Sequence, residues 1–243
     1  MRKIGLSLVL VGILGATSAV AEENGAFAGL GLGYGGANGK WTATEEMTQG
    51  EAVSAKFKNM SSFRYGLLAG YKHFFTPAFG VRAYASFDLG TKYSKDANMA
   101  VSDGAGGTMN IKLSPEVNSY NINANVDALY NFITNDALDF GIFGGLSLGY
   151  AHHKVDLEVN TGETAEDKMK FDGKLSGFDL GINFGFRANI ATNHGVELYS
   201  RFGVLQFKDD VSYTDAEDAT FSLKAPFELR QPYQVGLRYT FSF

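Results

Sequence analysis

Residues 233–243, at the end of the chain, alternate strictly between apolar and polar side chains. Every odd position from Tyr233 onward is apolar, and the chain ends on Phe243. Alternation with a period of two predicts a β-strand with one apolar face. A terminal strand of this kind, closed by an aromatic residue, is typical of the β-barrels of bacterial outer membranes.

The same alternation recurs upstream. An apolar face opposes a face of Gly, Asn, Ser and a few charges in residues 27–34, 63–75, 79–93, 118–132, 138–150, 175–190 and 196–207. Three of the connections are short and the other four are long, as in outer-membrane barrels with short periplasmic turns and long extracellular loops. We therefore predict an all-β fold, namely an eight-stranded antiparallel transmembrane β-barrel with short periplasmic turns and long extracellular loops.

The spacing of aromatic residues supports a membrane barrel over a soluble one. Tyr120 and Tyr130, and likewise Phe140 and Tyr150, mark the two ends of an apolar face. Ten tilted strand residues climb about 25 Å, which is the height of the outward apolar band of such barrels. A soluble barrel or sandwich also alternates, but its outer face would carry long charged side chains. The small polar residues here fit the interior of an eight-stranded barrel.

The N-terminus has the form of an export signal. Arg2 and Lys3 precede an apolar run, and Ala19-Val20-Ala21 offers a small-residue cleavage site. We predict a signal peptide over residues 1–21, a barrel domain over residues 22–243, and a location in the outer membrane. Zero cysteines exclude disulfides and thiolate sites. A net charge of −5 without a basic stripe argues against a nucleic-acid partner.

Several predicted strands resemble the Helicobacter-type outer membrane protein family of ε-proteobacteria. The matching segments are YGLLAGYKHFF (65–75), FGVRAYASFDLG (79–90), VDALYNFI (126–133), FGIFGG (140–145) and HGVEL (194–198), together with the aromatic terminus. The resemblance implies an outer-membrane location and a role as adhesin or porin. The chain lacks the large extracellular region of the adhesin members, so their receptor binding does not carry over.

Charged residues on the polar face are the main candidate site. We expect them to form a charge network in the lumen, built from Arg82, Asp88, Asp127, Asp179, Arg187, Glu197, Arg201 and Arg238. Counting from the short turns sets Arg187 opposite Glu197, and Arg82 at the height of Asp127. Buried charges must be paired, because desolvation costs several kcal/mol per ion. The network predicts a plugged barrel, and a narrow ion-selective pore lined by the same groups is the alternative.

Catalytic, cofactor and metal sites are not predicted. His152 and His153 are expected at the membrane interface, without the spacing of a metal site on one strand face. Ser200 is the only serine considered for a barrel-embedded lipid hydrolase, which would need a histidine and an orienting group beside it. No histidine matches its height, so we predict a protein that is not an enzyme.

The remaining expectations concern partners. The terminal strand, with Tyr239, Phe241 and Phe243, is expected to be an assembly signal that the β-barrel insertion machinery captures by strand pairing. Acid clusters at 163–167 and 209–218 are solvated surface, with divalent bridging to lipopolysaccharide as a second possibility. We predict a structural or adhesin-like surface-contact role through the extracellular loops, with a small passive pore as alternative and a hydrolase as distant third. No motif names a host ligand.

Overall fold

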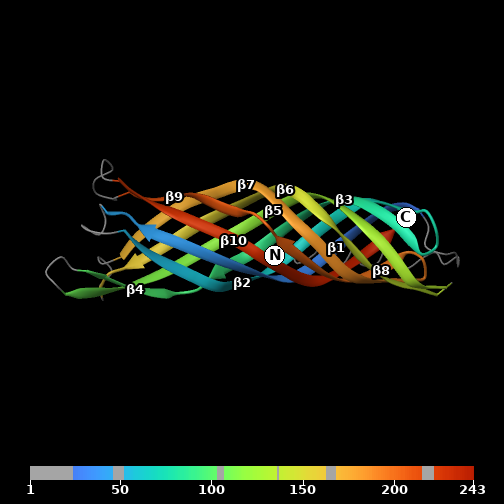
Figure 1. Ribbon diagram of the computed structural model, residues 1–243, viewed down its shortest axis with the longest axis horizontal. Coiled ribbons are helices and arrows are strands. Elements are labelled where there is room, and N and C mark those ends of the chain that lie inside the picture. Colours follow the sequence, from blue (N-terminus) through green and yellow to red (C-terminus); the bar gives the residue numbers. More distant parts are fainter. Residues whose placement is uncertain (1–23, 46–51, 103–106, 136, 163–167, 215–221) are drawn as a thin grey trace, which may run out of the picture.

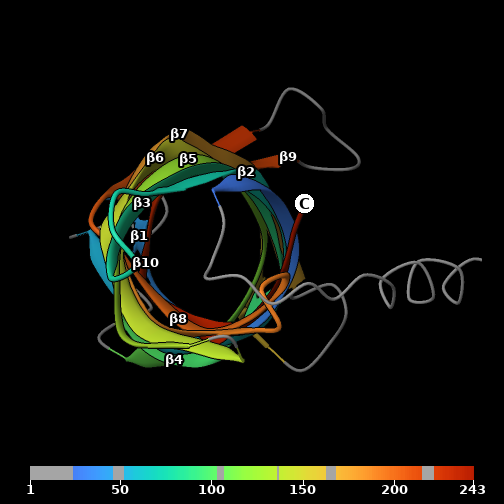
Figure 2. The same ribbon diagram turned by 90° about the vertical axis from the view of Figure 1, so that its right-hand side faces the viewer.

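The protein is a closed antiparallel β-barrel (Figures 1 and 2). The computed structural model describes residues 24–45, 52–102, 107–135, 137–162, 168–214 and 222–243, so the predicted signal peptide lies outside the described residues. In these ranges there is no helix long and apolar enough to cross a membrane. The strands are β1 (Gly25–Ala43), β2 (Val53–Phe74), β3 (Phe79–Ser94), β4 (Ala97–Ser102), β5 (Thr108–Asn135), β6 (Leu138–Asn160), β7 (Lys168–Ile190), β8 (His194–Gly203), β9 (Gln206–Thr214) and β10 (Ser222–Ser242).

The barrel closes between its first and last strands. β1 pairs with β10 from Phe27 opposite Ser242 to Trp41 opposite Phe227. The ten strands follow eight paths around the ring, because β4 continues β3 along β5, and β9 continues β8 along β10. The predicted barrel class is confirmed, and the predicted count of eight is corrected to ten strands by these two interruptions.

The predicted strands are right at one end and too short at the other. At the short turns, the predicted starts at residues 79 and 138 coincide with Phe79 and Leu138. At the opposite end, β5 begins at Thr108 and β6 runs on to Asn160, ten residues beyond each prediction. Most of the sequence expected in long loops is therefore strand, which extends the barrel wall above the membrane. The prediction missed these extensions because it identified strands by their outward apolar face.

The apolar face changes sides along the barrel axis. Up to an upper aromatic rim that includes Tyr34, Phe63, Tyr150 and Phe178, most large apolar side chains point outward and are exposed. Above this rim they point inward and form a cluster of buried residues. Its members include Trp41, Phe57, Met60, Tyr93, Leu113, Leu157, Phe171, Leu175, Phe207, Phe227 and Leu229. The upper part of the barrel thus has the hydrophobic core of a water-soluble protein.

Bulges help to exchange the faces. In β2 the register shifts at Asn59, whose φ of 57° is rare for a residue other than glycine and most tolerable for Asn. Its backbone N–H donates to the Asn38 side-chain oxygen at 3.0 Å. The shift turns Phe57 inward and leaves Lys56 and Lys58 on the outside. β1 keeps the same alternate positions facing inward along its whole length. These positions are mostly glycine in the lower part of the strand and include larger apolar residues in its upper part.

Candidate functional site

Arg82 is the centre of the polar interior. Its Nε donates to Asp127 Oδ2 at 3.0 Å, and its two terminal nitrogens donate to the Glu197 carboxylate on the far wall. All three side chains are almost fully buried. The guanidinium also lies 4.4 Å from the centre of the Phe143 ring. This cluster ties β3 and β5 to β8 across the lumen, so the two carboxylates are both compensated by one cation and its neighbours.

A second layer lies nearer the upper rim. Arg201 lies 2.9 Å from Asp179 Oδ1 and donates to Ser147 at 2.9 Å. The Asn121 amide donates to the other Asp179 oxygen at 2.6 Å and accepts a hydrogen bond from Arg64 at 2.7 Å. Five strands, β2, β5, β6, β7 and β8, are therefore linked through one continuous set of polar contacts.

The third layer joins cations to tyrosines. Arg238 lies 3.8 Å from the centre of the Tyr199 ring and donates to the Tyr84 hydroxyl at 3.2 Å. Gln234 donates to the Tyr199 hydroxyl at 2.6 Å and to Asp88 at 3.2 Å. Stacking on an aromatic face stabilises a desolvated guanidinium without a carboxylate. The interior tyrosines fill the lumen as well as bonding within it.

The structure places all eight residues of the expected charge network inside the barrel. Arg187 is opposite Glu197 in register, as counted from the turn, but Glu197 binds Arg82 and Arg187 donates to Asn131 at 3.1 Å. The sequence did not single out Tyr84 and Tyr199, although both occupy inward positions of the alternating pattern. The alternation of inward and outward positions was therefore the sequence feature that could have identified both tyrosines as interior residues.

Above the polar layers the interior is filled by hydrocarbon. The rings of Phe57 and Phe227 stack across β2 and β10 with centres 6.2 Å apart, and both side chains are fully buried. Trp41 contacts Phe171 edge-on at 5.9 Å from the opposite wall. Side chains from opposing walls thus meet at the barrel axis. Along the barrel axis, the interior therefore changes from layers of paired charges to a layer of apolar side chains.

His153 lies at the junction of these two layers. It is fully buried, with its ring 4.6 Å from that of Phe207, and neither ring nitrogen has a hydrogen-bond partner among the described residues. Burial, followed by the positive charges of Arg64 and His152, lowers the pKa of His153 to about 3. The expectation of an interfacial position is wrong for His153, because inward parity continues past the rim on β6. It holds for His152, which stacks outside on Tyr120 at 5.0 Å.

One serine–histidine contact lies on the outer surface. His152 Nδ1 is 2.6 Å from the Ser176 hydroxyl. Within the described ranges, no acid or amide binds the other ring nitrogen of His152. The serine considered from the sequence, Ser200, faces outward opposite Phe184 and Val235, not a histidine. The contact lacks the orienting third group of a hydrolase triad.

The terminal aromatic residues lie on the closing seam. The Tyr239 hydroxyl is 2.8 Å from His194 Nδ1, and the rings of Phe241 and Phe243 meet edge-on at 5.3 Å. The Phe243 side chain is 76% exposed, while its backbone N–H donates to Ala26 at 2.9 Å. The strand is therefore paired, and its last side chain remains accessible from outside.

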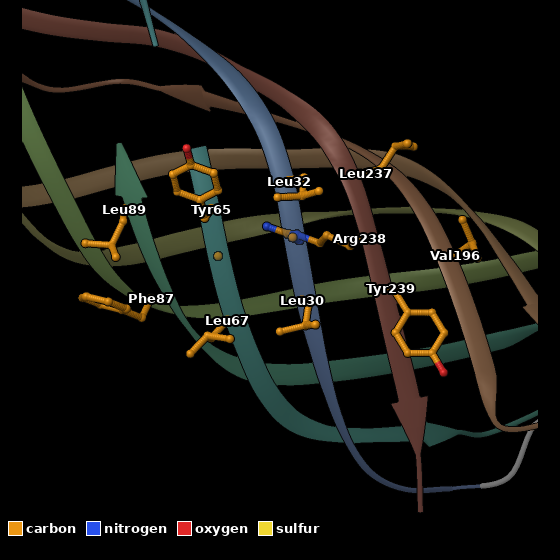
Figure 3. A pocket seen from close by; sticks show the side chains of 12 residues that line it. Leu30, Leu32, Tyr65, Leu67, Phe87, Leu89, Val196, Leu237, Arg238 and Tyr239 are labelled. Carbon is orange, nitrogen blue, oxygen red and sulfur yellow. The ribbon is translucent and has the colours of Figure 1, made fainter. Parts of the chain in front are cut away.

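An apolar groove crosses the same seam on the outer surface (Figure 3). It is formed by outward side chains of β1, β2, β3, β8 and β10, among them Leu30, Leu32, Leu67, Leu237 and Tyr239. Gly31 and Gly66 also line the groove, at positions of the wall that face the lumen. The groove lies within the apolar band, so hydrocarbon fills it in a membrane.

The chain is similar to several solved outer-membrane protein structures. Similar solved structures include OprG from Pseudomonas aeruginosa, at 17% identity over 95% of this chain and 100% of that one, with a TM-score of 0.44. Another is Ail, the attachment invasion locus protein of Yersinia pestis, at 13% identity over 89% and 99% of the two chains, with a TM-score of 0.36. Neisserial surface protein A matches at 16% identity over 90% and 99%, with a TM-score of 0.34.

Sequence comparison gives the family. No curated protein matches the chain. The model of the Helicobacter outer membrane protein family matches residues 66–243, which is most of the sequence and includes the strands from β3 to β10. The resemblance drawn from the strand motifs is thereby confirmed, as is the outer-membrane character of the barrel. The chain belongs to the Helicobacter outer membrane protein family.

Proposed function

We propose that this protein is a non-conducting, non-catalytic barrel that holds a rigid platform above the outer membrane for contact at the cell surface. The observation that carries the proposal is the filled interior. The Arg82 cluster closes the membrane part, and the Phe57–Phe227 stack closes the part above it. Because a layer of paired charges is followed by an apolar layer, an ion has no continuous path through the barrel.

The extended strands support the surface-contact role. A hydrophobic core above the rim keeps the upper wall ordered, so the upper ends of the described strands are presented at a fixed height. Flexible loops would lose conformational entropy on binding, whereas a pre-ordered wall avoids part of that cost. We expect the ligand to be a surface molecule that contacts the charged outer face of the barrel wall above the rim.

Planar-bilayer recording tests the closed barrel. We expect no steady conductance from the wild type, and none from the double variant Phe57→Ala/Phe227→Ala, whose polar layers are intact. Heat-dependent gel mobility verifies that each sample is folded. Steady conductance of the wild type would overturn the proposal in favour of a small passive pore. Conductance of the double variant alone would show that the polar layers do not close the lumen.

Comparing intact cells with and without the protein on an array of host ligands tests the contact role. We expect at least one ligand to retain only the cells that carry the protein. Equal retention of both strains on every ligand would contradict surface contact.

Assembly through the C-terminal strand is part of the same proposal. The exposed Phe243 ring and the aromatic face of β10 support capture by the insertion machinery before β10 pairs with β1. Phe243→Ser should lower the amount of protein inserted in cells, measured by surface labelling, while the purified variant refolds in detergent as the wild type does. Unchanged surface labelling would refute this role.

A further inference from the structure

Four cations gather on one outer face of the barrel, directly above the upper rim. Lys40 on β1, Lys56 and Lys58 on β2, and Arg230 on β10 line a shallow groove together with Asn38, Gln206 and Glu228. We call these four side chains the cationic patch. Lys56, Lys58 and Arg230 are exposed, and Lys40 is half-buried. The register shift at Asn59 gives β2 its two outward lysines.

The cationic patch lacks internal compensation. Lys40 and Lys56 are directly opposite each other in the β1–β2 register, an arrangement in which like charges destabilise a sheet. Glu228 is opposite Lys40 on β10, but its carboxylate accepts from Gln206 at 2.8 Å and lies 3.6 Å from Lys208. Among the described residues, no acid forms an ion pair with any of the four cations. The arrangement therefore suits an external anion.

The far side of the barrel is built differently at the same level. Lys112 pairs with Asp96 at 2.8 Å, Lys154 with Asp156 at 3.0 Å and Lys168 with Glu158 at 3.0 Å. These lysines are exposed but already have acidic partners. The four cations of the β10–β1–β2 face have no such ion pair among the described residues.

The apolar groove (Figure 3) lies below the cationic patch, and β1, β2 and β10 contribute side chains to both. Leu32, at 65% exposure, and Lys40 are on one strand, and the residues between them climb about 20 Å along the barrel axis. An amphiphile with acyl chains and phosphates would place its chains in the groove and its phosphates against the cations. Lipid A, which carries phosphorylated sugars above several acyl chains in the outer leaflet, has this form.

We propose that the β10–β1–β2 face binds one lipid A moiety of lipopolysaccharide, with its phosphates on the cationic patch and an acyl chain in the apolar groove. This contact uses cations directly, in contrast to the divalent bridging expected from the acid clusters. It orients the barrel in the outer leaflet. It holds whether or not the lumen conducts, so a failure of the closed-barrel proposal leaves it standing.

Native mass spectrometry of the detergent-solubilised full barrel tests the proposal with bis-phosphorylated lipid A as probe. We expect the wild type to bind one lipid A, and binding to weaken as salt rises. The variant Lys40→Gln/Lys56→Gln/Lys58→Gln should bind about 10- to 100-fold more weakly, since each cation near an anionic surface contributes several-fold. The matched control Lys112→Gln/Lys154→Gln/Lys168→Gln should bind as the wild type does.

Two further probes identify the ligand group. Dephosphorylated lipid A should bind weakly and equally to the wild type and both variants. If it binds the wild type as tightly as lipid A does, phosphate recognition is wrong. Equal losses in the two lysine variants would show a general charge effect and overturn the site. A heparin fragment bound more tightly than lipid A at the patch would overturn the membrane ligand in favour of a polysaccharide.

Discussion

Below the upper aromatic rim the barrel wall is apolar outside and charged inside, whereas above the rim it is charged outside and apolar inside. The same strands run through both parts, and most keep their inward parity, as β6 does from Asp139 to Val159. What changes is the medium that each face meets. In lipid the inward polar groups must satisfy one another, while in water the inward apolar groups are driven together.

The two parts of the barrel are stabilised by different contributions to the free energy of folding. The lower part relies on charges whose pairing offsets a large desolvation cost. The upper part relies on removing hydrocarbon from water. Removing one charge should therefore destabilise the lower part by leaving its buried partners uncompensated, whereas removing apolar volume should destabilise the upper part by opening a cavity. The junction at His153 should be sensitive to pH.

The largest effect is expected at the centre of the polar part. Arg82→Leu leaves the buried carboxylates of Asp127 and Glu197 without their shared cation. We expect the free energy of unfolding to fall by about 3–5 kcal/mol, measured by denaturant titration in lipid vesicles. The triple variant Arg82→Leu/Asp127→Leu/Glu197→Leu should recover most of this loss, since apolar replacements of a buried ion cluster are often neutral. A loss under about 1 kcal/mol in the single variant would contradict the role of the pair.

A smaller effect is expected at the junction. The pKa of His153 is about 3 when folded, against an ordinary value near 6.5, so below pH 6.5 the unfolded chain binds the proton first. Stability should fall as pH drops from 6.5 toward 3, by about 2–3 kcal/mol from this group at pH 4.5. His153→Phe should remove that part of the pH dependence. Identical pH profiles for the two proteins, measured by denaturant titration, would refute the burial of a neutral imidazole.

The smallest effect is expected where β2 exchanges its faces. Asn59→Val places a β-branched residue at a positive φ and should lower the free energy of unfolding by about 1–2 kcal/mol. Asn59→Gly relieves the conformation and should change stability by only a few tenths of a kcal/mol. Equal values for Val and Gly in thermal unfolding would show that the backbone conformation does not matter there.

The strand boundaries at the short-turn end of the barrel could be predicted from local sequence patterns. The starts of β3 and β6 follow from alternation that restarts after the breaks near Pro77 and at residues 135–137. The pairing of Arg82 with Asp127 follows from register across one strand pair. The contact of Arg82 with Glu197 does not, because those residues are 115 positions apart and meet only when the ring closes.

The barrel class, the outward apolar band and the inward direction of the charges can all be predicted from the sequence, because each depends on a period-two pattern that is local to a strand. The continuation of the wall above the membrane with its chemistry reversed, and the enclosure of His153, emerge only when the strands assemble into the barrel. The upper core needs apolar side chains from opposite walls, and no single strand records that meeting. The cationic patch likewise depends on the ring, since β1 and β10 bring Lys40 and Arg230 together from the two ends of the chain.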